Sequence, residues 1–198
     1  MNDLTVNEVH VALMIFKDFS VKYNANNLSK KLGLSAMGTL KILKKLQVQN
    51  LLKSEEIGKS RIYSINFEND YTKQYISFLL RKEAEESDPR IKRWIVELRK
   101  LDDVSGIGLL FGSVIRSDKY NDIDFLAVLK QAQINEFNEK LDELNKLNVK
   151  RIHSVKQSVQ DIKDNLARKD KVLVDAVRLA IVVFGYEKYI EVIESVSR

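Results

Sequence analysis

The chain has 198 residues, of which 44% are hydrophobic and 31% charged, with 33 Lys and Arg against 28 Asp and Glu. It contains no cysteine and two histidines, which excludes disulfides, thiolate metal sites and cysteine nucleophiles, and leaves too few ligands for a histidine-based zinc site. The longest apolar run near the C-terminus, 179–184, is much shorter than the roughly 20 residues of a membrane span, so we expect a soluble protein without a membrane partner.

The excess positive charge lies in the N-terminal third. Residues 1–66 carry ten basic and five acidic side chains, and the remaining residues carry 23 of each, so this segment accounts for the whole net charge of +5. We therefore expect a separate module with a polyanionic partner. The first residues, Met1-Asn2-Asp3, precede neither a basic region nor an apolar core of signal-peptide type, which favours the cytoplasm.

Three helices are predicted in this third. Apolar residues at helical spacing predict the first over 6–19, and a short second helix over 27–32 ends at Gly33. Ser35 is a plausible N-cap for the third. Its core side would hold Thr39, Ile42, Leu43 and Leu46.

Two strands follow over 51–53 and 60–67, where side chains alternate with period two, and 55–59 supplies the turn. This order of elements and the residues within it resemble the winged-helix family of DNA-binding regulators. The resemblance is carried by Asn27-Leu28-Ser29-Lys30-Lys31-Leu32-Gly33-Leu34-Ser35, by Leu43-Lys44-Lys45-Leu46 with Asn50-Leu51-Leu52, and by Gly58-Lys59-Ser60-Arg61-Ile62-Tyr63-Ser64-Ile65.

The resemblance implies that the third helix enters the major groove of double-stranded DNA and that the wing touches phosphate or the minor groove. The positions that would face DNA are Ala36, Met37, Leu40, Lys41 and Lys44 on the helix and Lys59 and Arg61 on the wing. Gly38 and Leu40 stand where small polar residues are common, which weakens the case for base reading. The alternative is a solvated lysine face on a winged helix that contacts protein.

Residues 68–102 are predicted to be a helical linker. A helix over 69–81 would end at an acidic break over 83–87, and Asp88-Pro89 would start the next helix. The apolar faces of the two helices hold Tyr71, Tyr75, Phe78 and Leu79, and Ile91, Trp94, Ile95, Leu98 and Leu101. We expect the aromatic side chains to be buried on the C-terminal domain or in a homodimer, with Tyr71, Tyr75, Phe78, Trp94 and Ile95 as the dimer surface.

The C-terminal half alternates strands and helices. Apolar runs predict strands over 104–111 and 125–129, a helix over 134–147 and a third strand over 149–155. From 159 onward the apolar spacing predicts a helical end, including 172–184. An α/β or α+β domain follows.

A polar loop separates the first two of these strands. An apolar run breaks at Gly112-Ser113, and Asp122 and Asp124 open the next run, with a spacing that puts both carboxylates on one face of a strand. Paired acids of this kind can hold a divalent metal against a triphosphate. Together with Arg116 and the runs 121–126 and 185–190, they resemble the nucleotidyltransferase superfamily that includes DNA polymerase β, and in particular its minimal single-domain members.

The resemblance implies a site for a nucleoside triphosphate (NTP) and Mg²⁺. Gly112 would let the backbone approach phosphate, Ser113 would donate to the triphosphate, and Arg116 would add positive charge. Asp122 and Asp124 would be the metal-binding and catalytic carboxylates. The alternative is a surface turn whose acids are merely solvated.

Two departures from that family bear on catalysis. The loop is short, with Ser117 where glycine is usual, and the strand that normally supplies a third carboxylate has no acid over 148–155. His153 could act as a base there, although a surface or core histidine is the alternative, and Lys150 and Arg151 would repel metal.

We therefore predict an α+β protein with a winged-helix DNA-binding domain at 1–67, a helical linker at 68–102 and a nucleotidyltransferase-like domain with a helical tail at 103–198. The predicted function is a DNA-binding transcriptional regulator whose second domain binds Mg-NTP with weak or no transfer. The first alternative is an active nucleotidyltransferase that modifies a protein, nucleic acid or small molecule. The second is an interaction module with neither ligand.

Overall fold

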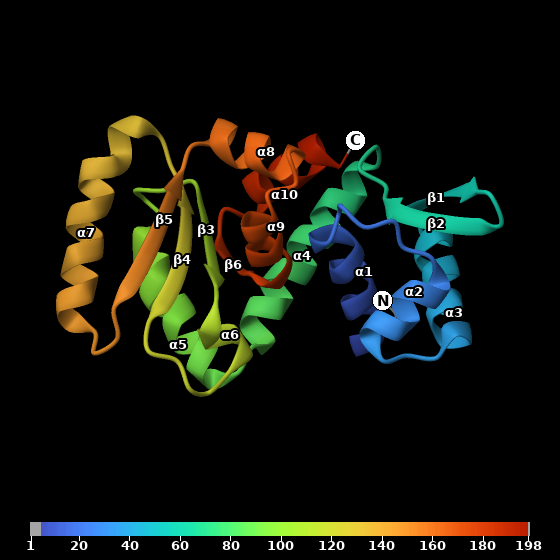
Figure 1. Ribbon diagram of the computed structural model, residues 1–198, viewed down its shortest axis with the longest axis horizontal. Coiled ribbons are helices and arrows are strands. Elements are labelled where there is room, and N and C mark those ends of the chain that lie inside the picture. Colours follow the sequence, from blue (N-terminus) through green and yellow to red (C-terminus); the bar gives the residue numbers. More distant parts are fainter. Residues whose placement is uncertain (1–4, 198) are drawn as a thin grey trace. The chain divides into compact units, whose positions relative to one another are not determined.

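The computed structural model describes residues 5–197 and divides into two compact units (Figure 1). The first unit extends to Leu79 and the second comprises Leu80–Val196. The division lies within one helix, α4 (Asp70–Glu86), so a continuous helix contributes residues to both units. None of the helices within 5–197 is long and apolar enough to cross a membrane.

The first unit has the element order of a winged helix, as the sequence predicted. It consists of α1 (Val6–Lys17), α2 (Ala25–Leu32), α3 (Ala36–Val48) and a hairpin of β1 (Leu52–Ile57) and β2 (Ser60–Ile65). Its core includes Phe16, Leu28, Leu43, Leu46 and Tyr63, together with Thr39. Of the core positions predicted on α3, only Ile42 is half-buried.

Local capping defines the ends of these helices. The Ser35 hydroxyl accepts a hydrogen bond from the amide of Gly38 at 3.1 Å, which confirms the predicted N-cap of α3. Gly33 ends α2 in the left-handed conformation at φ +66°. Glycine adopts that conformation without the Cβ penalty that other residues incur, so it stops the helix.

The predicted turn over 55–59 is wrong in extent. β1 and β2 pair from Leu52 with Ile65 to Ile57 with Ser60, so Glu55 and Glu56 belong to the strand. Only two residues make the turn, and Gly58 adopts φ +60°, which tight hairpins require.

The predicted break over 83–87 is also wrong, because α4 continues to Glu86. Lys82 pairs with Glu86 one turn away, and Ala84 is buried in the core of the second unit. As predicted, Asp88 caps the next helix, α5 (Pro89–Leu98), which a short 3₁₀ turn, Arg99–Leu101, extends.

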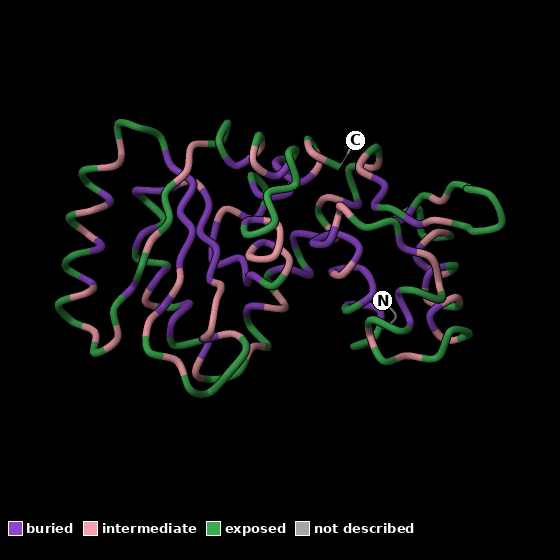
Figure 2. The backbone as a smooth tube through the Cα atoms, in the orientation of Figure 1, coloured by how far each residue is buried: buried purple, intermediate pink, exposed green. Residues whose placement is uncertain are grey.

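A four-stranded mixed sheet forms the centre of the second unit. Its strands are β3 (Ile107–Phe111), β4 (Ile123–Val128), β5 (Ile152–Gln157) and β6 (Ile181–Phe184), in the order β5-β4-β3-β6. β3 pairs antiparallel with β4 and β6, and β4 pairs parallel with β5. Figure 2 shows that the inner strands of this sheet are largely buried.

Helices cover both faces of the sheet (Figure 1). α5 and α7 (Ile134–Leu147, after a 3₁₀ turn at Gln131–Gln133) lie on one face, and their core includes Trp94, Phe125 and Phe137. The other face is covered by α8 (Val159–Ala167), α9 (Lys171–Leu179) and α10 (Tyr186–Val196). The short helix α6 (Ser113–Arg116) connects β3 to β4.

The helix predicted over 172–184 is wrong in its second half. α9 ends at Leu179, and after Ala180 the residues Ile-Val-Val-Phe form strand β6, in which every residue is buried. All four are β-branched or aromatic residues, and three of them pair with β3, an environment that favours extended backbone. β5 likewise begins at Ile152, three residues later than predicted.

Candidate functional site

One face of α3 is open to solvent in the first unit. Ala36, Met37, Lys41 and Lys44 are exposed and Leu40 is half-buried, as the winged-helix resemblance implied. Lys45 differs from the other two lysines of α3, because its ammonium group pairs with the buried carboxylate of Glu8 on α1. Lys45 therefore links α3 to α1, whereas Lys41 and Lys44 face outward.

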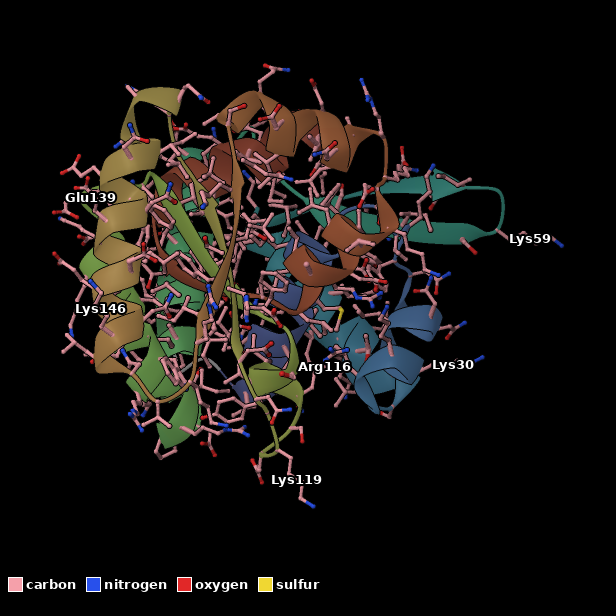
Figure 3. All side chains as sticks on the ribbon, turned by 60° about the vertical axis from the view of Figure 1, so that its left-hand side comes forward. Lys30, Lys59, Arg116, Lys119, Glu139 and Lys146 are labelled. Carbon is pink, nitrogen blue, oxygen red and sulfur yellow. The ribbon has the colours of Figure 1, made fainter. Side chains whose placement is uncertain are left out.

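A basic groove lies between α2, α3 and the wing. It has a volume of about 340 Å³ and is lined by Asn24, Asn26, Leu40, Lys44, Lys59, Arg61 and Tyr63, among others. The structure thus brings Lys44, Lys59 and Arg61 to one groove, with Lys41 exposed on the same helix. Figure 3 shows Lys59 extending from the tip of the wing.

The cations of this surface differ in their partners. Arg61 Nη2 lies 2.7 Å from Glu56 Oε1 across the hairpin, and this hydrogen bond together with the charge of Glu56 raises the pKa of Arg61. Within residues 5–197, Lys41, Lys44 and Lys59 have no carboxylate partner. The surface consequently presents three unpaired lysines and one arginine that an acid partly neutralises.

A second group of predicted residues meets where β3 ends and β4 begins. Gly112 follows β3 at φ +82°, and a Cβ placed on it would lie 1.8 Å from Asp124 Oδ2. The amide of Ser113 donates a hydrogen bond to the Asp124 carboxylate. Only glycine therefore allows Asp124 to pack against this turn.

Asp122 and Asp124 lie beside the histidine of the neighbouring strand. Asp124 is in register with His153 of β5, and His153 Nε2 lies 3.7 Å from Asp122 Oδ2. Burial and the charge of Asp122 raise the pKa of Asp124, whereas His153, the Ser113 amide and Arg116 oppose the rise. Five predicted residues therefore lie close enough to interact electrostatically: Ser113, Arg116, Asp122, Asp124 and His153. Arg116 is exposed at the end of α6.

The donor set at this turn is small. No group of three or more His, Cys, Asp or Glu side chains within residues 5–197 could hold a metal ion by itself. Strand β5 has no acid. The side chains that could bind a metal ion at this turn are therefore the carboxylates of Asp122 and Asp124 and the imidazole of His153. Such a set suits Mg²⁺ only when phosphate and water oxygens complete its coordination, as they do around a bound triphosphate.

The loop that leads to Asp122 is held by residues that sequence reasoning missed. Tyr120 accepts a hydrogen bond from Trp94 Nε1 at 3.1 Å, and Lys150 Nζ lies 4.1 Å from the Tyr120 ring centroid and donates to the Tyr120 carbonyl. Arg90 Nη1 lies 2.6 Å from Asp118 Oδ1. Lys150 therefore supports the loop, whereas we expected it to repel metal, and no local pattern could have indicated contacts between residues so far apart in the sequence.

The predicted dimer surface is partly wrong. Trp94 and Ile95 are 2% and 3% exposed and belong to the core of the second unit, because α5 packs against its sheet. Tyr71 and Phe78 on α4 remain 57% and 48% exposed, and Tyr75 lies between them with its ring 6.4 Å from that of Tyr71.

No family model matches the chain, and no curated protein matches it by sequence. Solved structures of Lactococcus lactis ZitR, a zinc-responsive MarR family member, are similar to part of it. One of them aligns with 19% identity and a TM-score of 0.30 over 52% of this chain and 78% of ZitR. A single-residue mutant of ZitR aligns with 19% identity and a TM-score of 0.31 over 52% of this chain and 76% of that one.

Proposed function

We propose that the chain is a transcriptional regulator that binds double-stranded DNA through its winged-helix unit. The observation that carries the proposal is the convergence of Lys44, Lys59 and Arg61 on one groove between α2, α3 and the wing. In a winged helix this surface is the one that meets the duplex, with α3 in the major groove and the wing on the backbone. The N-terminal third also holds the whole net charge of the chain.

The salt dependence of binding tests this proposal. Each phosphate that a lysine or arginine neutralises releases counterions, so the logarithm of the affinity falls linearly with the logarithm of salt concentration. Replacing Lys41, Lys44, Lys59 and Arg61 with alanine removes up to four such contacts. We expect the slope to become less steep by about 3 to 4 and binding to disappear at moderate salt.

A matched control variant carries the same change in charge elsewhere. The residues Lys92, Lys119, Lys146 and Arg168 are exposed in the second unit and have no carboxylate partner within residues 5–197. Their replacement with alanine lowers the net charge by the same four units and is expected to leave most of the affinity intact. Equal binding by the two quadruple variants would show that the assigned surface is not the DNA interface.

We also propose that the second unit binds a magnesium nucleoside triphosphate. The specific observation in favour is the packing of Gly112 against Asp124, with the Ser113 amide on its carboxylate and Asp122 adjacent. This turn, which only glycine can form, fixes the Asp124 carboxylate near Asp122, so that the pair would face a metal ion bound to phosphates. The two carboxylates would hold Mg²⁺ that neutralises the phosphates, and Arg116 would add positive charge.

Transfer of the nucleotide is proposed to be slow or absent. Activating an acceptor hydroxyl usually requires a further base. At the position where β5 faces Asp124 the side chain is His153, with Arg151 two residues before it, rather than a carboxylate. An active nucleotidyltransferase that modifies a protein, nucleic acid or small molecule is the competing outcome.

Calorimetry and label transfer separate these outcomes. We expect triphosphate binding that requires Mg²⁺ and is lost in the double variant Asp122→Asn/Asp124→Asn. Asp142→Asn, which changes an exposed acid on α7, is the matched control. Rapid incorporation of label into an acceptor would show an active enzyme, and no binding at saturating Mg²⁺ would leave the second unit as a scaffold.

We further propose that the chain forms a homodimer through the exposed aromatic side chains of α4. Winged-helix and related proteins commonly bind two half-sites as dimers, and Tyr71 and Phe78 offer apolar surface on one helix face. Light scattering should give the mass of a dimer for the parent chain and of a monomer for Tyr71→Lys/Phe78→Lys. A parent chain that is monomeric at micromolar concentration would contradict this proposal.

A further inference from the structure

The half of α3 that comes first in the chain is apolar where it is exposed. Met37 is 65% exposed, Ala36 is exposed beside it, and Leu40 is half-buried one turn later. Recognition helices that lie in the major groove contact base edges mainly with their N-terminal residues. If the winged-helix unit binds duplex DNA as proposed, these apolar side chains are the ones that meet the bases.

The uncharged polar groups of α3 are already engaged within the fold. The Thr39 hydroxyl is buried and donates to the Ser35 carbonyl at 3.0 Å. Gln47 is half-buried and its amide donates to Ser54 Oγ at 3.0 Å. Apart from Lys41, the first half of α3 therefore offers no free hydrogen-bonding side chain to a base edge.

The exposed lysines of α3 lie further along the helix and belong to the basic surface. Lys44 lines the groove that also holds Lys59 and Arg61 of the wing, which places it among the residues that would contact phosphate. A phosphate contact fixes the position of a protein on DNA without reading its sequence. Sequence preference that does not depend on a lysine then comes from the apolar part of the helix.

We propose that Met37, with Ala36 beside it, recognises the C5-methyl group of thymine in the major groove. This methyl is the only apolar group that the bases present there, and alanine and other apolar side chains contact it in known complexes. Methionine suits the role because its unbranched thioether chain adapts to irregular apolar surfaces. The ligand class is thus duplex DNA rich in 5-methylpyrimidines, and this inference rests on the proposed DNA binding.

Four short duplexes test the inference by adding or removing that methyl alone. An alternating A·T duplex is compared with its A·U counterpart, and an alternating G·C duplex with its counterpart that contains 5-methylcytosine. We expect the methylated member of each pair to bind more tightly, by about fourfold for each methyl group contacted, which corresponds to ~0.8 kcal/mol. The methyl group is removed from an A·T duplex in one pair and added to a G·C duplex in the other. A preference for the methylated member of both pairs therefore cannot result from base composition and its effect on duplex shape.

Two alanine variants assign the effect to one residue. Met37→Ala is expected to abolish the preference for methylated duplexes while keeping the salt slope, because no cation is removed. Val48→Ala is the matched control, since Val48 is 87% exposed at the opposite end of α3. It should keep the preference.

Each contrary result has a distinct meaning. Equal affinity for the two members of both pairs would overturn the inference and leave the proposed DNA binding standing. A preference that survives in Met37→Ala would overturn the assignment to Met37. Absence of binding to all four duplexes at low salt, by a chain whose circular dichroism spectrum shows it folded, would overturn the proposed DNA binding and this inference with it.

Discussion

Replacing Lys45 with methionine should destabilise the winged-helix unit while sparing its proposed DNA surface. Glu8 on α1 is 4% exposed, one of its carboxylate oxygens contacts Lys45 Nζ, and the other accepts the Thr5 amide at 3.0 Å. Burial opposes ionisation of Glu8, but the hydrogen bonds from Lys45 and Thr5 outweigh it, so the pKa of Glu8 lies below its usual 4.5. Methionine retains most of the side-chain volume and removes the charge.

The structure limits the size of the effect. Removing one partner of a fully buried ion pair costs about 3–5 kcal/mol, because the other charge stays buried without compensation. The Lys45 side chain is 39% exposed, so water reaches the vacated position and replaces part of the lost interaction. We expect a loss of about 2 kcal/mol, which lowers the melting temperature of a unit of this size by about 10 °C.

Thermal unfolding followed by circular dichroism at neutral and acid pH measures this loss. Because the folded-state pKa of Glu8 is lowered, the stabilisation from its ionised form is present above the unfolded value and is lost as pH falls through the folded value. The difference between the parent and Lys45→Met should therefore shrink in acid.

The exposed Lys41, on the same helix, gives the matched control. Lys41→Met should leave the melting temperature nearly unchanged and weaken DNA binding, the reverse of Lys45→Met. Equal losses of stability in the two variants, or a difference between the parent and Lys45→Met that persists below the titration of Glu8, would refute this reasoning.

Three further predictions follow from individual contacts. Gly112→Ala should destabilise the second unit by about 1–3 kcal/mol in a denaturant titration and abolish triphosphate binding, because the new methyl displaces Asp124 from a turn at positive φ. Glu56→Gln should strengthen DNA binding at low salt, because it frees Arg61 from its acid; unchanged affinity would mean that Arg61 does not contact phosphate. At pH values above the pKa of Asp124, Asp124→Asn should increase the free energy of unfolding by less than about 1 kcal/mol and so raise the melting temperature, since a raised folded-state pKa means that ionisation costs stability; lower stability at neutral pH would contradict this.

Features of the fold that depend on neighbouring residues could be predicted from the sequence. Ser35 caps α3, Gly33 ends α2, and Asp88 with Pro89 begins α5, as expected, because a cap involves only residues within one turn. The wing could be predicted for the same reason, since its turn residue Gly58 lies between the paired strands.

Features decided by distant contacts could not be predicted. The polar run after residue 82 looks like a break, yet Ala84 is buried in the second unit and the helix passes through it. The run 181–184 follows a helical apolar pattern without a turn signal, and its partner strand β3 lies about 70 residues earlier in the chain. Short apolar runs are ambiguous between helix and strand until that partner is known.

The proposed nucleotide site includes residues that could be predicted from the sequence and contacts that could not. Gly112, Ser113, Asp122 and Asp124 could be found because the glycine turn and the two acids lie close together in sequence. The position of the Asp122 loop is instead set by Trp94 and Lys150, which reach Tyr120 from α5 and from the segment before β5. With Lys150 directed to Tyr120, the side chain that faces the two aspartates from β5 is His153, and the sequence pattern alone could not place it there.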